Sequence, residues 1–286
     1  MDRSYSPAAS AMSNPGAIKH GPLVTPFARA LAILSAFTPE DRWLCNSDLS
    51  ERAGIPASTV TRLTRTLLAL GYLCCDSGKR RFRLGPSALA LGYRAAADIE
   101  IHEAAHQRMH LFAERHHVHV HLCARNRLDV VVIDSCCTST IPASLQPAIG
   151  TRLGLASSAA GWALLASLPD AERDYLLSNL LRNAAPQPAR ESSDRWGHLG
   201  GQAGRRPSEA IGQIGQVREE GFCVALGQSG QPMTMVAAPV QLPGEAPLAV
   251  SCMGPSMLVG RARSERELGP ALVRMAQEIQ HSRALS

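Results

Sequence analysis

The chain has 286 residues, of which 45% are hydrophobic, and a formal net charge of +5. This length favours two domains with a core each, and no window approaches eighteen uninterrupted apolar residues, which excludes a transmembrane helix. Residues 1–94 contain twelve Lys/Arg and six Asp/Glu, so the first third carries all the excess positive charge and favours an anionic partner such as nucleic acid.

The leader and the cysteines indicate the compartment. Residues 1–24 are rich in Ala, Ser and Pro and lack the apolar block of a secretory signal, so we expect a flexible leader. The eight cysteines include two adjacent pairs and no CxxC spacing, which predicts neither a disulfide framework nor a zinc knuckle. Such cysteine usage fits a reducing environment, and we expect a cytoplasmic protein.

The first predicted helix lies in “TPFARALAILSAF”. Thr25 is its expected cap and Pro26 stands at the first helical position, a favoured start. Phe27, Leu31 and Leu34 recur at helical spacing, and Ala30, Ile33 and Phe37 widen this expected buried face. The helix is therefore predicted to pack on the core of the first domain.

Two further helices are predicted in tandem. “NSDLSERAG” offers Asn46 or Ser47 as the cap of a short helix and Gly54 as its stop. “IPASTVTRLTRTLLALGYL” follows as a longer helix that Ser58 can cap, with a buried stripe expected at Val60, Leu63, Leu67 and Leu70. Two helices joined by a Gly-containing turn, the second longer and more regular, form the helix-turn-helix pattern.

Hydroxyl and guanidinium groups occupy the other side of the longer helix. Hydroxyls bind phosphates and bases, and arginine binds guanine or phosphate in a bidentate manner. The alternative is an ordinary solvated helix face. The side chains of the two helices that we predict to bind DNA are Ser47, Ser58, Thr59, Thr61, Arg62 and Arg65.

A basic hairpin follows in “GYLCCDSGKRRFRLGP”. Two extended runs, 72–75 and 81–84, flank an Asp-Ser-Gly turn. A basic two-stranded hairpin directly after a recognition helix is typical of a winged helix, in which the hairpin meets the DNA backbone or the minor groove. The wing residues predicted to bind DNA are Lys79, Arg80, Arg81 and Arg83.

In this order, the motifs resemble the isocitrate-lyase-regulator (IclR) family of bacterial transcription regulators. “GIPASTVTRLTRTLLALGY” and “FRLG” are similar to the family's “GLPKSTVHRLLATL…GY” and “YRLG”. Later, “IGTRLGLASSAAGWALLASLP” is similar to “VGSRLPLHATALGKALLAALP”, while “REEGFCVALGQSGQPMTMVAAPV” and “AVSCMGP” match the “RGY…AAPV” and “SVSGP” blocks. The resemblance extends from about residue 25 to residue 280.

The resemblance implies an α+β protein with two functional domains. We expect an N-terminal winged helix-turn-helix at 25–92, a linker helix at 93–112, and a C-terminal GAF-like effector-binding domain with an antiparallel sheet at 113–286. Family members are homodimers or homotetramers whose winged helices bind a palindromic double-stranded DNA operator while the second domain binds a small-molecule effector. No cofactor is implied.

The resemblance also implies that the effector binds between the start of a helix and the neighbouring strands, where helix amides favour an anion. The matching positions are Leu145, Ala159, Ala160, Ala225, Met235, Ser251 and Met253. Of the polar side chains expected there only Ser251 remains, and Trp162 replaces the family's lysine. We therefore expect a more hydrophobic effector, an aromatic or acyl compound with one carboxylate. The alternative is a domain that has lost its effector and only supports oligomerisation.

The elements of the second domain follow from periodicity. Residues 95–116 are helical in pattern, “SSAAGWALLASL” predicts a helix, and a final helix is expected from Glu265 to His281. “HVHVHLCARNRLDVVVIDS” and “MTMVAAPVQLPGEAPLAVSCMG” each predict two strands around a turn. Residues 183–216, rich in Pro, Gly, Ser and Arg, are expected to form an irregular surface segment. This order of strands and helices suits an α+β sensor fold.

A histidine-rich stretch leaves two interpretations open. In “HHVHVHLC”, His117, His119, His121 and Cys123 recur at period two, on one face of a predicted strand. Imidazole and thiol groups bind zinc or nickel, but same-face neighbours lie about 6.6–7 Å apart, so one metal would reach two of them at most. A metal-responsive regulator is therefore the alternative to a polar strand that faces the effector or an interface.

An enzyme is not predicted. Ser157 and Ser158 lie near Gly161, yet no GxSxG elbow is present and no serine stands beside a credible base. Buried cysteines are more often inert than nucleophilic. The sequence therefore predicts a binding protein.

Overall fold

The computed structural model describes residues 24–38, 41–76, 78–97, 102–142, 145–182, 207–226 and 233–283. The chain divides into two compact units. The N-terminal unit comprises the residues up to Phe37 together with Trp43–Pro86, and the C-terminal unit comprises chiefly Ser87–Ser286. The predicted leader lies outside the described residues apart from Val24.

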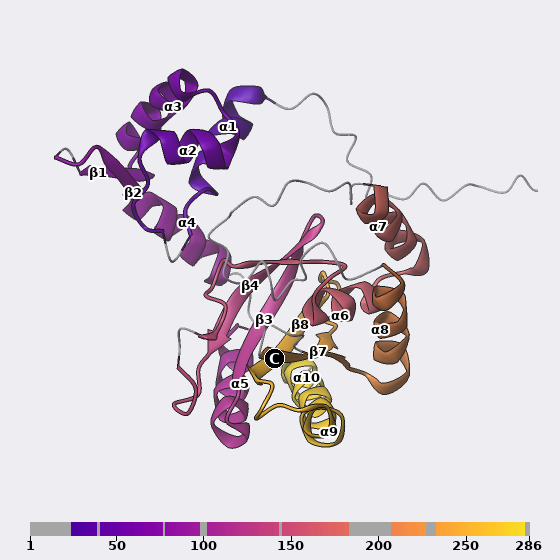
Figure 1. Cartoon of the computed structure of the whole chain (residues 1–286). Coiled ribbons are helices and arrows are strands. Elements are labelled where there is room, and N and C mark those ends of the chain that lie inside the picture. The colour runs from indigo at the N-terminus through magenta and orange to yellow at the C-terminus, as the bar shows by residue number, and fades with distance from the viewer. Residues whose placement is uncertain are drawn as a thin grey trace, which may run out of the picture. The chain divides into compact units, whose positions relative to one another are not determined.

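The N-terminal unit combines three helices with a hairpin (Figure 1). Ile33, Leu49, Val60 and Leu67 form its core together with Leu73. Strands β1 and β2 pair in antiparallel fashion, and a bridge between Leu44 and Phe82 ties the hairpin to the segment before α2. The predicted helix-turn-helix followed by a hairpin is thereby confirmed, with the elements α1 (Thr25–Leu34), α2 (Asn46–Ala53), α3 (Ala57–Ala69), β1 (Leu73–Asp76) and β2 (Arg81–Leu84).

The predicted helix caps are mostly wrong. The N-cap of α2 is Cys45 rather than Asn46 or Ser47, and its backbone N–H donates to the Asp48 carboxylate at 2.8 Å. Pro56, whose extended backbone starts α3, replaces Ser58 as the N-cap of that helix, and Val24 precedes Thr25 as the N-cap of α1. Gly54 does end α2, in the left-handed conformation (φ 64°) that glycine adopts without strain.

The predicted buried faces of α1 and α3 are also partly wrong. Phe27 and Leu31 are 64% and 46% exposed, contrary to the prediction, whereas Ile33 is fully buried, as predicted. Leu70, the residue after α3, is exposed. Thr64 of α3 is buried, and its hydroxyl donates to the Thr61 carbonyl of the same helix. Periodicity locates a helix, but its rotation toward the core is set by the neighbouring helices.

The C-terminal unit is built on one six-stranded antiparallel sheet in the order β5-β4-β3-β8-β7-β6. Both predicted strand pairs are confirmed, as β3 with β4 and β7 with β8. The strands are β3 (His119–Asn126), β4 (Asp129–Cys136), β5 (Arg152–Gly154), β6 (Cys223–Ala225), β7 (Met233–Val240) and β8 (Leu248–Pro255).

Helices cover both faces of this sheet (Figure 1). One core lies between the sheet and α5 and α10, and the other lies between the sheet and α6, α7 and α8. Strands β7 and β8 are therefore apolar on both sides. The helices are α4 (Pro86–Ala97), α5 (His102–His116), α6 (Ala159–Ser167), α7 (Asp170–Arg182), α8 (Pro207–Glu220), α9 (Arg261–Arg263) and α10 (Gly269–Arg283).

Two segments of the C-terminal unit differ from expectation. The predicted irregular segment 183–216 contains the start of α8 from Pro207, and the rest of it lies outside the described residues. The final helix begins with a π-helical stretch, η2 (Ser264–Leu268), before α10. The α+β class with a curved antiparallel sheet is confirmed.

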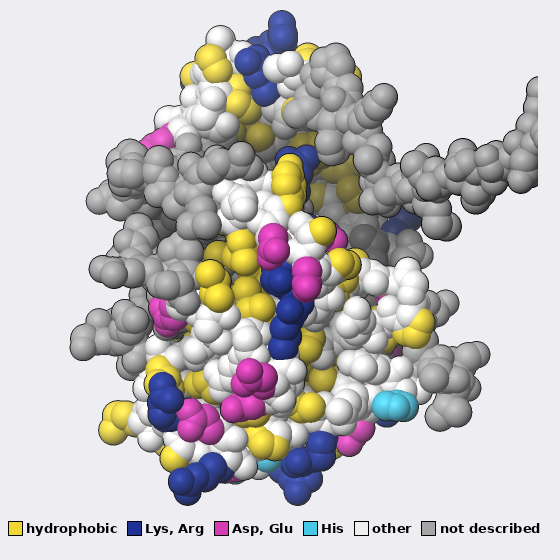
Figure 2. Space-filling view, turned by 90° about the vertical axis from the view of Figure 1, so that its right-hand side faces the viewer, with side chains coloured by type: hydrophobic (Ala, Val, Ile, Leu, Met, Phe, Trp, Pro, Cys, Tyr) yellow, Lys and Arg dark blue, Asp and Glu magenta, His cyan; other side chains and the backbone are white. Residues whose placement is uncertain are grey.

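Charges on the C-terminal unit are balanced locally. Figure 2 shows acidic and basic side chains side by side on one face. Asp170 at the start of α7 accepts from Arg173 and from Arg218 of α8, and these bonds hold the pKa of Asp170 below its usual range. Such exposed pairs contribute little stability, but they leave no cationic excess on these helices. None of the described helices combines the length and apolar character that a membrane crossing requires.

Candidate functional site

The first candidate surface is the outer side of α3. Ser58, Thr61, Arg62 and Arg65 are exposed, and Thr59 is half-buried. Ser47, on α2, is exposed as well, and its hydroxyl lies 2.9 Å from the Cys45 thiol. Among the described residues, neither arginine of α3 forms an ion pair with an acidic side chain, so both guanidinium groups are available to an anionic partner.

Asn46 holds one of these side chains, a role that the sequence did not suggest. Its amide nitrogen donates to the Thr61 hydroxyl at 3.1 Å and to the Ala57 carbonyl at 3.2 Å. The Thr61 hydroxyl in turn donates to the Ala57 carbonyl at 2.9 Å. Asn46 therefore couples the first turn of α2 to α3, and it orients the Thr61 oxygen.

The hairpin presents the basic wing residues. Lys79, Arg80 and Arg81 are exposed at its tip and return strand, and the Asp76 carboxylate accepts from the backbone N–H groups of Gly78 and Lys79. That Asx turn orders the tip without neutralising a side-chain cation.

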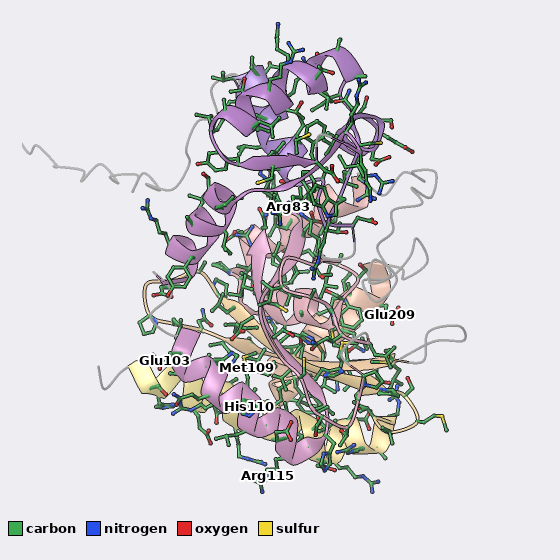
Figure 3. All side chains as sticks on the ribbon, turned by 90° about the vertical axis from the view of Figure 1, so that its left-hand side faces the viewer. Arg83, Glu103, Met109, His110, Arg115 and Glu209 are labelled. Carbon is green, nitrogen blue, oxygen red and sulfur yellow. The ribbon has the colours of Figure 1, made fainter. Side chains whose placement is uncertain are left out.

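Arg83, labelled in Figure 3, is held differently from the tip residues. Its guanidinium carbon lies 5.4 Å from the centroid of the Trp43 ring, a cation–π contact that restrains the side chain while keeping its charge. The wing thus combines the exposed cationic side chains of its tip with Arg83, whose guanidinium is held against Trp43.

The second candidate site lies at the start of α6. The Ser158 hydroxyl accepts from the backbone N–H of Gly161 at 3.1 Å, and the backbone N–H of Trp162 donates to the Ser158 carbonyl. The N–H groups of Ala159 and Ala160 have no such partner among the described residues, as is usual in a first helical turn. They give the site two amide donors at the positive end of the helix.

The sheet supplies the opposite wall in two cross-strand rows. One row joins Ala225, Met235, Met253 and His119 across β6, β7, β8 and β3. The next row joins Cys223, Ala237, Ser251 and His121. Both rows face α6, because Met235, Met253 and Ala237 belong to the same core as Ala159 and Ala160.

The structure therefore brings the predicted effector positions together. Six of them belong to one apolar cluster or pack against it, namely Leu145, Ala159, Ala160, Ala225, Met235 and Met253. Ser251 lies fully buried beside them, with its hydroxyl 3.9 Å from the Cys123 thiol. The side chains of this cluster and of Ser251 are uncharged, and the helix amides add a positive electrostatic potential at its edge.

His121 is the site residue whose role the sequence left open. It is fully buried, and neither ring nitrogen has a hydrogen-bond partner in the described part of the chain. Burial, with a smaller effect of the neighbouring His119, lowers the pKa of His121 to about 3, so the ring is neutral near neutral pH. The sequence signal was its alternation with Val120 and Leu122, which lie on the opposite face, but His119 shows the same alternation.

His119 is partnered and His117 is not in the strand. The His119 ring accepts from the Thr138 N–H at 3.4 Å and lies 3.3 Å from the Pro142 carbonyl, which assigns the proton to Nε2. His117 is exposed with φ 53°, before β3 begins. The prediction that His117, His119, His121 and Cys123 share one strand face is thus wrong for His117. No group of three or more potential metal-binding side chains occurs among the described residues.

Acid is expected to destabilise the C-terminal unit through His121. In the unfolded chain this ring binds a proton near its ordinary pKa of 6.5, whereas the folded protein resists protonation down to about pH 3. The unfolded state therefore binds more protons in this window, and the free energy of unfolding falls with falling pH by up to about 1.4 kcal/mol per unit for this residue. Urea unfolding between about pH 7 and about pH 5 should show a smaller pH slope in His121→Phe; an equal slope would contradict the burial.

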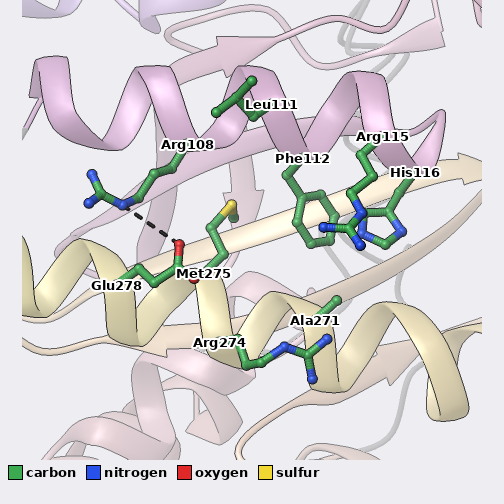
Figure 4. A pocket seen from close by; sticks show the side chains of 9 residues that line it. All are labelled: Arg108, Leu111, Phe112, Arg115, His116, Ala271, Arg274, Met275 and Glu278. Atoms are coloured by element: carbon green, nitrogen blue, oxygen red, sulfur yellow. Dashed lines mark ion pairs between the residues drawn. The ribbon is translucent and has the colours of Figure 1, made fainter.

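A separate groove lies between α5 and α10 (Figure 4). It has a volume of about 260 Å³, and Arg108 pairs with Glu278 at 3.8 Å on its rim. Its lining contains no predicted effector position, and it lies on the other side of the sheet from α6. The residues that line it are Arg108, Leu111, Phe112, Arg115, His116, Ala271, Arg274, Met275 and Glu278.

Comparison with known proteins shows similarity over most of the chain. Residues 27–76 match the IclR helix-turn-helix domain, and residues 93–188 match the bacterial transcriptional regulator IclR C-terminal. The chain is 30% identical to the HTH-type transcriptional regulator TsaQ1/TsaQ2 of Comamonas testosteroni, over 90% of this chain and 88% of that protein.

Solved structures have the same fold. A crystal structure of an IclR family transcriptional regulator from Brucella abortus is 29% identical, with a TM-score of 0.71 over 91% of this chain and 93% of that one. An IclR homolog from Microbacterium hydrocarbonoxydans, complexed with 4-hydroxybenzoate, has a TM-score of 0.68 at 20% identity, over 91% of this chain and all of that one (100%). The second likeness shows the fold alone.

Proposed function

The chain belongs to the IclR family of bacterial transcriptional regulators, and on this premise we propose that it couples a small organic effector to operator binding. The winged helix-turn-helix, residues 25–92, binds double-stranded DNA. Residues 113–286 bind the effector, and the linker helix at 93–112 connects the two domains. The protein acts in the cytoplasm as a homodimer or homotetramer.

The charge and exposure of the N-terminal unit support the DNA-binding half of the proposal. The observation that carries it is the coincidence of unpaired arginines on α3 with a basic wing, in a chain whose cationic excess lies entirely in this region. Arg62 and Arg65, with Ser47, Ser58, Thr59 and Thr61, contact base edges and nearby phosphates. Lys79, Arg80, Arg81 and Arg83 neutralise phosphate or enter the minor groove.

The site at α6 supports the effector half. Amide donors at Ala159 and Ala160 bind a carboxylate, while Leu145, Ala225, Met235 and Met253 enclose an apolar body and Ser251 adds one hydroxyl. The Microbacterium homolog, which was solved with 4-hydroxybenzoate, has a ligand of this chemistry. A sensor domain that only oligomerises is the alternative. We disfavour the metal-responsive version because both His119 nitrogens are engaged and His117 lies outside the strand.

Selection of duplexes from a random library is the direct test. The full chain is expected to enrich a two-fold-symmetric sequence, because a symmetric dimer places two equivalent α3 helices on two half-sites. Affinity for that sequence should fall steeply with salt, and an aromatic or acyl carboxylate should change it by about fivefold or more. Enrichment of no sequence would refute the DNA half; an affinity that no acid alters would favour a sensor that only oligomerises.

A further inference from the structure

The imidazole of His121, which has no hydrogen-bond partner among the described residues, is not used by the proposed function. A buried polar group without a hydrogen bond is costly, and in native proteins it indicates a missing partner such as a ligand or an ordered water. His121 has two such atoms, Nδ1 and Nε2, and both are fully buried. His121 lies within β3, where an apolar residue would have avoided the free-energy cost of burying these two atoms without hydrogen bonds.

The ring faces the site rather than the opposite core. His121 stands directly opposite Ser251 on β8, and Ser251 stands opposite Ala237 on β7. Ala237 in this row and Met253 in the neighbouring row belong to the core that contains the first residues of α6. The alternate residues of β3, Val120 and Leu122, belong to the core beneath α5 and α10. The imidazole and the first turn of α6 therefore lie on the same side of the sheet.

The amides of α6 and the imidazole of His121 bind different chemical groups, and this difference predicts which groups the ligand carries. The Ala159 and Ala160 amides at a helix N-terminus favour a negative charge. A neutral imidazole offers one N–H donor and one lone pair. The described titratable group that acts on it is His119, whose own pKa is lowered by burial. A second carboxylate at His121 would need a proton on the ring, which burial opposes. The group placed against His121 is therefore uncharged, and a hydroxyl serves either tautomer because it both donates and accepts.

Resting on the effector-binding function proposed above, we infer that His121 is a specificity-determining residue that recognises a hydroxyl on the effector. The effector is a hydroxylated aromatic or acyl acid, with its carboxylate at the start of α6 and its hydroxyl at His121. Met235 and Met253, flexible and polarisable, enclose the apolar body between these ends. A site built to bond a hydroxyl discriminates against the analogue that lacks it, because its buried polar atoms are then left unpaired.

Matched ligand pairs test this inference. Hydroxybenzoates and short hydroxyalkanoates are compared with the counterparts in which a methyl group replaces the hydroxyl, by calorimetric titration of the full-length protein. The wild type is expected to prefer the hydroxylated member of a bound pair by about tenfold or more. In His121→Phe this ratio should approach one, and His121→Gln, which keeps a donor and an acceptor, should restore part of it. Because each variant is judged by the ratio of its affinities for the two members of a pair, a general loss of affinity does not affect the comparison.

A histidine elsewhere in the same unit provides the control. His110, labelled on α5 in Figure 3, is exposed on the helix that covers the other face of the sheet, and His110→Phe should keep the wild-type ratio. If acids bind and alter DNA affinity but the preference is absent, or survives in His121→Phe, the inference about His121 is wrong while the proposed function stands. If no acid binds or alters DNA affinity, both are overturned.

Discussion

Trp162→Ala is expected to lower the free energy of unfolding of the C-terminal unit by about 3–5 kcal/mol. The indole is fully buried in α6, and its Nε1 donates to the Ala156 carbonyl at 2.9 Å. Truncation removes the largest fully buried side chain among the described residues of the unit, and it leaves both a cavity and an unpaired carbonyl. Urea unfolding followed by far-UV circular dichroism measures the loss.

Two variants make this prediction specific. Trp162→Phe keeps an aromatic ring and should lose less stability, because it loses the hydrogen bond but only part of the side-chain volume. Trp43→Ala, in the N-terminal unit, removes a half-exposed indole and should leave the transition of the C-terminal unit unchanged. A loss below about 1 kcal/mol in Trp162→Ala would mean that α6 is not anchored to the sheet through this residue.

Arg62→Ala is expected to cost about 1–3 kcal/mol in binding to the selected operator and much less on a scrambled duplex. The Arg62 guanidinium is exposed on α3 and forms no ion pair with a described acidic residue, so its loss removes a DNA contact without freeing a buried charge. By contrast, Arg81→Ala in the wing should weaken binding to both duplexes alike and reduce the salt slope by about 1, because a phosphate contact carries no sequence information.

Fluorescence anisotropy with the two duplexes over a range of salt concentrations separates these effects. Arg266→Ala is the matched control, because Arg266 is an exposed arginine of η2 in the C-terminal unit. It should change neither affinity nor salt slope. Equal losses on operator and scrambled DNA in Arg62→Ala would show that α3 contacts the backbone rather than the bases.

Much of the architecture follows from local pattern. The stop at Gly54, the basic hairpin after α3 and the two pairs of antiparallel strands in the C-terminal unit are each determined by residues close together in the chain, so periodicity and turn residues predict them. The caps were less predictable, because Cys45 and Pro56 start helices where Ser47 and Ser58 looked more suitable. A residue type that favours the N-cap position shows where a helix can start. The actual start is set by the residue whose backbone leaves the helical conformation, here Cys45 and Pro56.

The sequence by itself determined the order of the elements, the cationic bias of the first third and the positions that match the effector site of the resembled family. Only the tertiary structure decided which faces are buried, as Phe27 and Thr64 illustrate, and which histidine lacks a partner. His119 and His121 are equivalent in sequence pattern. Yet Thr138 and Pro142 form hydrogen bonds with the His119 ring, whereas the His121 ring has no partner among the described residues. Hydrogen-bond satisfaction depends on contacts between residues far apart in the chain, and such contacts exist only once the sheet and its helices have assembled.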